Sequence, residues 1–312
     1  MANINPSSHL NPNSGFGVQA NQVGERFINK DGSYNLKKTG LPAWKTMSIY
    51  SYMQSIHWTK FLLIIICFYF CFNVLFTFGY ILIGVDQLDG FEDTYFLHNV
   101  EECFYFSTQT FTTVGYGRLN PHGSGANILA SLETMIGWLY FALVTGLFYG
   151  RATRPKAYLA FSQNAVFAPY RDGKGLMLRV VPYKANHHLT NAKAVVNLAL
   201  LNIEKQEYEF YSLKLERSRI DSLSMNWTIV HPIDEESPFL NISPEDMEAA
   251  DIEVSVQITG FDPVFSNTVL ARTSYTFKEI IYNAKFVPMY HTSQDGKTTV
   301  LELDKLNEYV LL

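Results

Sequence analysis

The chain contains a run of 25 residues, Phe61–Val85, without a charged side chain. At about 1.5 Å per residue a helix of this length measures about 37 Å, more than the hydrocarbon core of a bilayer requires. A core helix of a soluble protein is the alternative, but such helices rarely run this far without a charge. A secretory signal does not fit, because the run starts about sixty residues into the chain and lacks a small-residue cleavage site. The run therefore predicts a membrane span.

A second apolar stretch, Ala126–Gly150, carries one charge, Glu133, and is also long enough to span a bilayer. We expect the spans at about residues 60–85 and 126–150. Between them, Cys103–Gly117 is uncharged too, but its 15 residues are too few to cross. Irregular glycine-containing backbone survives at membrane depth only when it is buried in protein or lines water. We therefore expect a re-entrant pore helix and loop over residues 101–117.

Basic residues near the span ends predict the orientation of the chain in the membrane. Seven of them flank the two-span region, whereas residues 86–125 hold one basic residue, Arg118, and six acidic ones. Both termini are therefore expected in the cytoplasm. The flanking basic residues are Lys37, Lys38, Lys45, Lys60, Arg151, Arg154 and Lys156, and the acids are Asp86, Asp89, Glu92, Asp93, Glu101 and Glu102.

The re-entrant segment ends in the pentapeptide TVGYG, residues 113–117. A given pentapeptide occurs by chance in about one in ten thousand chains of this length. A ring of backbone carbonyls can replace the water shell of a potassium ion, and glycines permit the backbone angles that point successive carbonyls at one axis. We therefore predict a potassium selectivity filter rather than a simple turn. Its expected K⁺ ligands are the carbonyls of Thr113, Val114, Gly115 and Tyr116 and the Thr113 hydroxyl, and Gly117 completes the motif.

One chain supplies a quarter of such a ring, so the filter predicts a homotetramer. The side chains of Val114 and Tyr116 are expected to point away from the pore and pack behind the filter. No cofactor other than K⁺ in the filter is expected.

Three residues of the second span are candidates for roles in the pore. Glu133 is an acid within a span, which makes it a functional candidate, here as a brace behind the filter. A snorkelling acid at the interface is the alternative. Gly137 and Gly146 permit either helix bending or close helix packing, and the sequence leaves that choice open.

Before the first span, apolar residues recur every three positions between polar ones, which predicts an amphipathic helix over residues 44–57 at the inner membrane surface. An ordinary soluble helix is the alternative. Lys60, Arg151, Arg154 and Lys156 are expected at the same depth, where they can bind anionic lipid headgroups. The apolar positions are Trp44, Met47, Tyr50, Met53 and Ile56.

The composition changes after Pro155. Ile252, Val254, Val256 and Ile258 alternate with polar residues, as in a strand with one buried face. Seven short runs, with breakers and no helical periods between them, predict an all-β, immunoglobulin-like sandwich. No glycine-rich phosphate loop appears, which argues against a nucleotide-sensing domain. The runs cover residues 176–183, 193–203, 208–217, 227–233, 252–258, 269–277 and 285–291.

The expected organisation is an N-terminal cytoplasmic segment (1–43), an interfacial slide helix (44–57), a transmembrane pore domain (58–152) and a cytoplasmic sandwich (153–312). The net charge of −5 and the 47% hydrophobic residues exclude a disordered chain and a basic nucleic-acid arm. No nucleophile–base or metal constellation indicates an enzyme. His187-His188 lack further ligands at suitable spacing, so we expect exposed loop histidines rather than a metal site.

Several motifs beyond the filter make the chain resemble the inward-rectifier potassium channels, most closely their prokaryotic members. Together they cover most of the chain and are more specific than the filter, which all potassium channels share. They are Arg26–Asn35, Thr145–Leu147 leading into Arg154-Pro155, Phe161–Val166, Leu176–Val180, Trp227–Ile233, Ser237-Pro238 and Ala271–Tyr275.

The resemblance implies a homotetramer with a slide helix, two spans and a pore loop, whose sandwich domains form a second vestibule on the pore axis. It places the ring of Tyr149 at the helix-bundle gate, where a hydrophobic constriction blocks ions. It also implies regulation by anionic lipids at the basic residues named above. In the family, such lipids inhibit prokaryotic members and activate animal ones.

The chain departs from the family pattern at three positions. Phe141 stands where strong rectifiers have a cavity acid, and Asn191 where they have a vestibule acid. We therefore expect polyamines or Mg²⁺ to be weak blockers. Gln109 stands where the family usually has a filter-bracing glutamate, which gives Glu133 a larger share of filter support. The extracellular cysteine pair of animal members is missing, which fits a bacterial inner-membrane protein.

Two other functions remain open at this stage. One is a two-span potassium channel gated by a soluble cytoplasmic ligand, which the strand-only pattern and the missing phosphate loop disfavour. The other is a membrane-anchored β-sandwich binding protein whose loop is structural.

Overall fold

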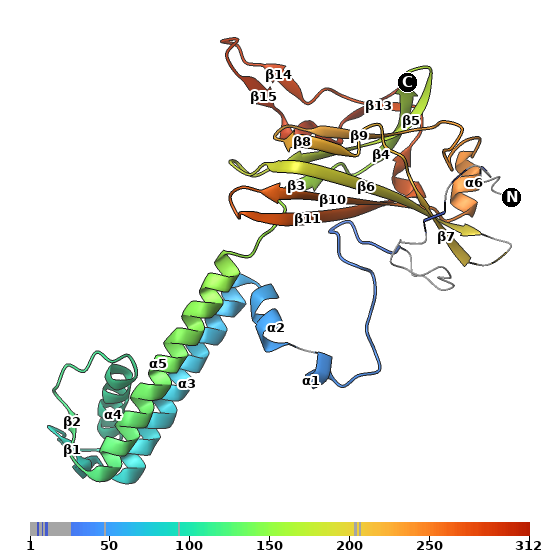
Figure 1. Cartoon of the computed structure of the whole chain (residues 1–312). Helices are drawn as coiled ribbons and strands as arrows, with labels where there is room; N and C mark the ends of the chain where they lie inside the picture. Colours follow the sequence, from blue (N-terminus) through green and yellow to red (C-terminus); the bar gives the residue numbers. More distant parts are fainter. Residues whose placement is uncertain are drawn as a thin grey trace. The chain divides into compact units, whose positions relative to one another are not determined.

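The computed structural model describes residues 5, 8, 10–11, 26–46, 48–92, 94–202, 205 and 207–312, apart from the side chains of Ala43 and Trp44. The chain divides into two compact units (Figure 1). The helical unit comprises Thr39–Arg154. The sandwich unit comprises Met1–Lys38 together with Pro155–Leu312.

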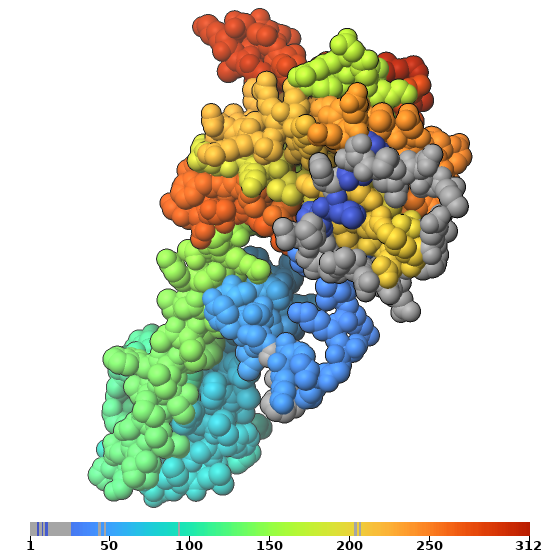
Figure 2. All heavy atoms as spheres, turned by 45° about the vertical axis from the view of Figure 1, so that its right-hand side comes forward, coloured from blue at the N-terminus to red at the C-terminus, as the bar shows by residue number. Residues whose placement is uncertain are grey.

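Two helices of the helical unit are long and apolar enough to cross a membrane, α3 (Trp58–Ile83) and α5 (Ser124–Ala152). They run side by side (Figures 1 and 2). Many of their apolar side chains are exposed, as Leu82 and Leu139 are, which suits a lipid environment. Against the expected limits of 60–85 and 126–150, α3 lies two residues earlier and α5 extends two residues further at each end.

A third helix, α4 (Phe96–Phe111), lies between the two long ones in sequence and packs against both. It begins five residues before the expected start at residue 101. Its buried Cys103 and Phe106 pack in one apolar cluster with residues of α3 and α5. The 3₁₀ turn η1 (Val85–Gln87) follows α3. The short strands β1 (Leu88–Asp89) and β2 (Asn120–Pro121) pair antiparallel beside the segment that follows α4.

The expected single slide helix over residues 44–57 is wrong. The segment forms two short helices, α1 (Ala43–Thr46) and α2 (Ile49–Ser55). Ser48 begins α2, because its side-chain oxygen accepts the N–H of Ser51 as an N-cap. Of the five apolar positions, Met47 and the side chain of Trp44 lie outside the described residues.

The sandwich unit consists mainly of two five-stranded sheets, which confirms the predicted sandwich. One sheet has the order β11-β10-β6-β7, with β8 paired to β6. The other has the order β12-β4-β5-β3, with β9 paired to β5. The largest apolar cluster of the chain lies in this unit and includes Leu178, Leu198, Val254 and Ile258.

The strands of the two sheets are β3 (Leu159–Phe161), β4 (Ala165–Tyr170), β5 (Gly173–Pro182), β6 (Leu189–Asn202), β7 (Glu207–Ser212), β8 (Arg219–Leu223), β9 (Trp227–Pro232), β10 (Glu253–Asp262), β11 (Asn267–Thr276) and β12 (Ile280–Ile281). The remaining elements of the unit are α6 (Pro244–Ala249), η2 (Phe277–Glu279), β13 (Ala284–Phe286), β14 (Tyr290–Thr292), β15 (Thr299–Leu301), η3 (Leu303–Asn307) and β16 (Tyr309–Leu311).

Three details of the strand pattern are corrected. Helix α6 interrupts the strands, because Ser243 and Asp246 form a capping box with Pro244 at the first turn. The run 285–291 is split between β13 and β14, since Pro288 has no N–H to donate to a ladder. Strands β3, β4, β8 and β12 of the two sheets have no counterpart among the predicted runs.

Glu253 lies on the polar face of the predicted alternation, yet it is buried. Its carboxylate accepts the backbone N–H groups of Phe27 (2.5 Å) and Ile28 (3.0 Å) from the N-terminal segment. Ser274 of β11 donates to the Ile28 carbonyl. Residues near the N-terminus therefore cover the outer face of β10 and β11.

Candidate functional site

The backbone of the TVGYG segment alternates in the sign of φ. Thr113, Gly115 and Gly117 have φ values of 60°, 53° and 83°, and the two residues between them are not in the left-handed region. Such alternation turns successive peptide groups the same way, as a ladder of carbonyl ligands requires. Glycine adopts these angles without strain, whereas Thr113 is held there against its preference. The backbone therefore has the geometry expected of an ion-coordinating loop.

The inner end of this segment is tied to α4 through one backbone carbonyl. The carbonyl oxygen of Gln109 accepts the N–H groups of Val114 (2.8 Å) and Gly115 (3.3 Å), and Thr113 N–H donates to Thr110. Within the described residues the side chain of Gln109 makes no hydrogen bond. Gln109 thus contacts the predicted filter through its main chain. Its side chain, which stands where the family usually has a filter-bracing glutamate, takes no part in this contact.

Val114 and Tyr116 are 52% and 80% exposed. The expectation that they pack behind the filter is therefore not met within one chain. A valine and a tyrosine this exposed leave apolar surface uncovered within one chain.

Glu133 of α5 is fully buried, which excludes the snorkelling alternative. Its Oε1 accepts a hydrogen bond from Ser107 Oγ of α4 at 2.5 Å, and its Oε2 accepts one from Tyr80 Oη of α3 at 2.6 Å. Ser107 also lies 3.2 Å from the carbonyl and the side-chain oxygen of Asn73 in α3. This network joins α3, α4 and α5.

The two glycines of α5 have different surroundings. A Cβ at Gly137 would collide with the carbonyl of Phe111, the last residue of α4, so this glycine permits close packing of α5 on the pore helix. A Cβ at Gly146 would meet nothing within 4 Å. Gly146 is therefore free of any packing requirement in one chain, and bending remains the candidate role for it.

Phe141 and Tyr149 lie on the same helix. The Phe141 ring contacts Phe111 and Tyr140, with centroids 6.2 and 5.5 Å apart. Tyr149 lies in the last turn and is 71% exposed, with no ring partner among the described residues.

The sequence suggested that Arg151 binds lipid headgroups, but its guanidinium is already bonded within the chain. Its guanidinium donates to the carbonyls of Met53 (2.7 Å) and Ile56 at the end of α2, and lies over the rings of Trp58 and Phe61 at 4.6 and 4.9 Å. Carbonyls at a helix end lack intrahelical partners, and a cation there is favourable. Arg151 thus joins α2, α3 and α5.

The remaining basic candidates are exposed. Lys60 makes no ion pair in the described part of the chain, and Arg154 reaches only the Gln54 carbonyl, at 3.5 Å. Lys156, in the sandwich unit, is exposed as well.

Two predictions for the sandwich unit can be compared with its contacts. Asn191 has a φ of 51°, and its side-chain oxygen accepts from Arg219 Nη2 at 2.7 Å. His187 is not an exposed loop histidine: it is half-buried and its Nδ1 lies 2.8 Å from Asp262 Oδ2. No group of three or more metal-ligating side chains occurs in the described residues.

The sequence reasoning missed Asn73, Tyr80 and Ser107. A signal was present, since Asn73 is a strongly polar residue inside an uncharged span, where polar side chains normally have partners. The ion pair between Arg118 and Glu102 was missed too, because nothing in the sequence selects one of six acids as the partner.

Comparison with known proteins identifies the family. The inward rectifier potassium channel C-terminal domain family matches residues 159–311, and the ion channel family matches residues 81–154. The inward rectifier potassium channel Kirbac3.1 of Paramagnetospirillum magnetotacticum is 33% identical over 290 residues, which cover 91% of this chain and 95% of that protein. The chain belongs to the inward rectifier potassium channel family.

Within this family the resemblance extends to animal channels. The ATP-sensitive inward rectifier potassium channel 12 of Gallus gallus is 27% identical over 85% of this chain and 67% of its own length. The channel of the same name from Mus musculus is 30% identical over 62% of this chain and 48% of its own length. The match to the bacterial relative covers nearly the whole of both proteins and supports membership in the prokaryotic branch. The chain is thus a membrane-spanning member of a potassium channel family.

Proposed function

We propose that the chain conducts K⁺ passively across a membrane through a filter built from residues 113–117. The alternation of φ along this segment carries the proposal, because it suits a ladder of carbonyl ligands. The carbonyls of Thr113, Val114, Gly115 and Tyr116 and the Thr113 hydroxyl are the proposed ligands. Reconstitution into liposomes tests the proposal: K⁺ or Tl⁺ uptake is expected, and no uptake from a folded, assembled protein would contradict it.

The conducting form is proposed to be a homotetramer. One chain provides a single strand of carbonyls, whereas coordination of a dehydrated ion needs a ring. The exposed side chains of Val114 and Tyr116 supply apolar surface for neighbouring copies. The mass of the detergent-solubilised protein tests this, and a monomer or dimer that conducts would contradict it.

The gate is proposed to lie at Tyr149, near the end of α5. Four exposed rings at this position can narrow the path or exclude water from it without a charged plug. Gly146, one turn before Tyr149 and free of packing contacts, is the proposed hinge.

Anionic lipids are proposed to modulate the channel through Lys60, Arg154 and Lys156. All three are exposed, and cations next to a membrane attract anionic headgroups. Arg151 is assigned a structural role instead, because its guanidinium is already bonded. Flux from liposomes with and without an anionic lipid tests this, and a response that survives neutralisation of all three residues would contradict it.

Rectification by intracellular polyamines or Mg²⁺ is proposed to be weak. Phe141 offers no charge, and Asn191 is bonded to a cation, Arg219, which repels polyvalent cations. Steep, voltage-dependent spermine block of reconstituted channels would contradict the proposal.

We also propose a bacterial inner membrane as the location, with both termini in the cytoplasm. The basic flanks of the two spans and the acidic segment between them support this orientation.

A further inference from the structure

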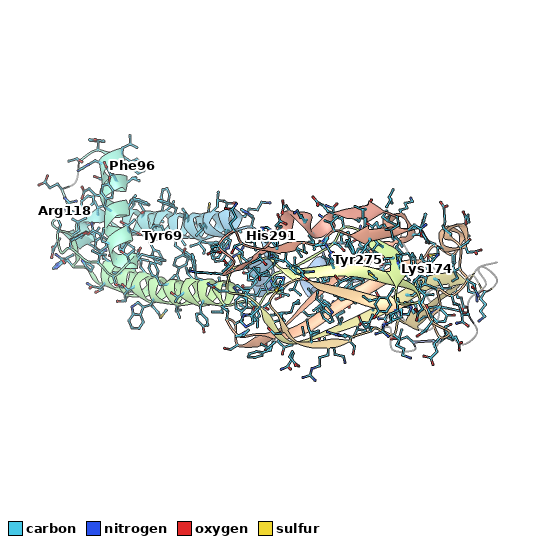
Figure 3. All side chains as sticks on the ribbon, turned by 90° about the horizontal axis from the view of Figure 1, so that it is seen from above. Tyr69, Phe96, Arg118, Lys174, Tyr275 and His291 are labelled. Atoms are coloured by element: carbon cyan, nitrogen blue, oxygen red, sulfur yellow. The ribbon has the colours of Figure 1, made fainter. Side chains whose placement is uncertain are left out.

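The sandwich unit contains a cavity of about 420 Å³. Residues of β4, β5 and α6 line it, together with the loop between β9 and α6 and two residues between β12 and β13. Figure 1 shows α6 at one end of the two sheets, and Figure 3 shows Lys174 of β5 towards the same end of the sandwich unit. Small-molecule sites in proteins usually have volumes of roughly 300–1,000 Å³. The cavity is therefore large enough to hold a small organic molecule.

The wall of the cavity is largely apolar. Phe167 of β4 is buried, and its ring stacks on the Tyr282 ring with centroids 5.0 Å apart. The Phe239 ring meets the Phe167 ring edge-on at 5.5 Å, and Met247 of α6 is buried as well. The half-buried aliphatic side chains of the lining are Ile233, Leu240 and Ile242. This wall offers aromatic and aliphatic contact to an apolar ligand body.

Lys174 adds a positive charge to the lining. Its backbone is fixed, because its carbonyl accepts the N–H of Ile233 at 2.9 Å. Its side chain is exposed and makes no ion pair with any residue that the structure describes. Two acids that follow Ile233 already have partners: the Asp234 carboxylate accepts the N–H of Glu236 at 3.1 Å, and Glu236 pairs with Lys214 at 3.0 Å. The ammonium group of Lys174 is therefore available to an anionic ligand.

The hydroxyl of Tyr282 adds a hydrogen-bond donor. Among the described residues its one partner is Met247 Sδ, at 2.6 Å. A thioether sulfur is a weak acceptor, so an oxygen acceptor of a ligand would be a better partner. Burial raises the pKa of Tyr282 to about 12, and the negative charge of the exposed Glu245 acts in the same direction. The hydroxyl therefore keeps its proton at neutral pH and remains a donor.

We propose that this cavity is a binding site for an apolar monocarboxylate, whose body lies against Phe167 and Phe239 and whose carboxylate pairs with Lys174. A neutral apolar molecule would leave the cation without a partner. A polyanion such as a nucleoside phosphate would meet one basic residue in the described lining, and burying its other charges against apolar side chains would be costly. A molecule with one acid group and an apolar body suits both parts of the lining. This inference does not depend on the proposed potassium conduction.

The test is titration calorimetry of the purified full-length protein with phenylbutyrate and with phenylbutanol, which has the same body without the charge. The acid is expected to bind about tenfold more tightly than the alcohol, the difference expected for one charge-assisted hydrogen bond. Lys174→Gln should weaken binding of the acid about tenfold and leave the alcohol unchanged. Tyr282→Phe keeps the ring beside Phe167 and should weaken the acid about threefold. Lys297→Gln is the matched control, because Lys297 is an exposed lysine between β14 and β15, outside the cavity lining, and both affinities should stay unchanged.

Leu240→Trp fills the cavity from a half-buried position and should abolish binding of both molecules. No binding of phenylbutyrate to the unaltered chain overturns the proposal, and so do equal affinities for the acid and the alcohol. Affinity for the acid that survives both Lys174→Gln and Leu240→Trp unchanged places binding elsewhere and overturns the proposal too. If Leu240→Trp does not fold, Lys174→Gln carries the test, since its side chain is exposed. The titration involves no K⁺ flux, so its failure and the failure of the proposed conduction are separate outcomes.

Discussion

The hydroxyl of Ser107 lies 2.5 Å from a carboxyl oxygen of Glu133, and this contact joins the pore helix α4 to α5 inside the helical unit. The other oxygen of the same carboxyl group accepts a hydrogen bond from Tyr80 of α3. Burying a carboxyl group costs free energy unless the group is hydrogen-bonded. This one carboxyl group therefore couples the packing of the three helices.

Glu133→Gln is expected to destabilise the assembled channel by about 1–3 kcal/mol, because the amide cannot accept both hydroxyl donors. The thermal midpoint of the purified channel measures the loss. Ser131→Ala is the matched control, since Ser131 is an exposed residue of α5 that bonds only its own helix. Equal midpoints for Glu133→Gln and the unaltered chain would show that the network contributes nothing.

Gly137→Ala is expected to cost about 1–3 kcal/mol and to reduce K⁺ flux, because the added methyl group collides with the Phe111 carbonyl at the end of the pore helix. Gly146→Ala meets no atom and should stabilise α5 by up to about 1 kcal/mol. If Gly146 is the hinge, the same change lowers flux without lowering the midpoint. A tolerated Gly137→Ala variant with normal flux would refute close packing as its role.

Tyr149→Ala is expected to raise K⁺ flux, because it removes the proposed constriction. Tyr149→Phe keeps the ring and should retain the flux of the unaltered chain. The side chain is 71% exposed, so neither change should alter stability by more than about 0.5 kcal/mol. Unchanged flux in a folded Tyr149→Ala channel would count against the gate.

His231 of β9 is expected to make the protein less stable in mild acid. Burial lowers the pKa of His231 below its usual value, although the bond to the Lys214 carbonyl and the nearby Asp234 oppose this. Its Nδ1 lies 2.6 Å from the Lys214 carbonyl and its Nε2 2.8 Å from Ser237 Oγ, which suits a neutral ring.

The direction of the pH effect on stability follows from the lowered pKa of His231. The folded chain binds a proton less readily than the unfolded chain, so the stabilisation is complete above about pH 6.5 and is lost as the pH falls. The loss is at most about 1.4 kcal/mol per pH unit. His231→Gln should reduce the shift in thermal midpoint between pH 6.5 and 5.5, and half-buried His188→Gln should not. An identical shift in the unaltered chain and His231→Gln would exclude His231 as the cause.

The elements that the sequence predicted well are those defined by local pattern. The run Phe61–Val85 has no charged residue, so its sequence predicted a long apolar helix. The alternation from Ile252 to Ile258 likewise predicted β10. Helix α6 was not predicted, although the sequence contains a signal for it: Ser243 and Asp246 have the spacing of a capping box, with Pro244 between them.

The features that escaped prediction depend on residues distant in sequence. The alternating pattern places Glu253 on the solvent-facing side of its strand, yet its carboxylate accepts two backbone N–H groups from residues more than two hundred positions away. The sequence predicts Arg151 as a lipid ligand, because the neighbouring residues do not indicate that the carbonyls of Met53 and Ile56 lie beside it in the fold. Glu133 was predicted as a functional candidate, but its hydrogen-bond donors come from two other helices and could not be predicted.

The most direct test of the account is the reversal potential of the reconstituted channel with K⁺ on one side of a bilayer and Na⁺ on the other. Selective conduction through residues 113–117 predicts a reversal potential close to that of a membrane permeable to K⁺ alone, and a collapse towards zero when Gly115 is replaced by alanine, whose Cβ disfavours the φ of 53°. A reversal potential near zero in the unaltered channel, or one that survives Gly115→Ala unchanged, would contradict the account.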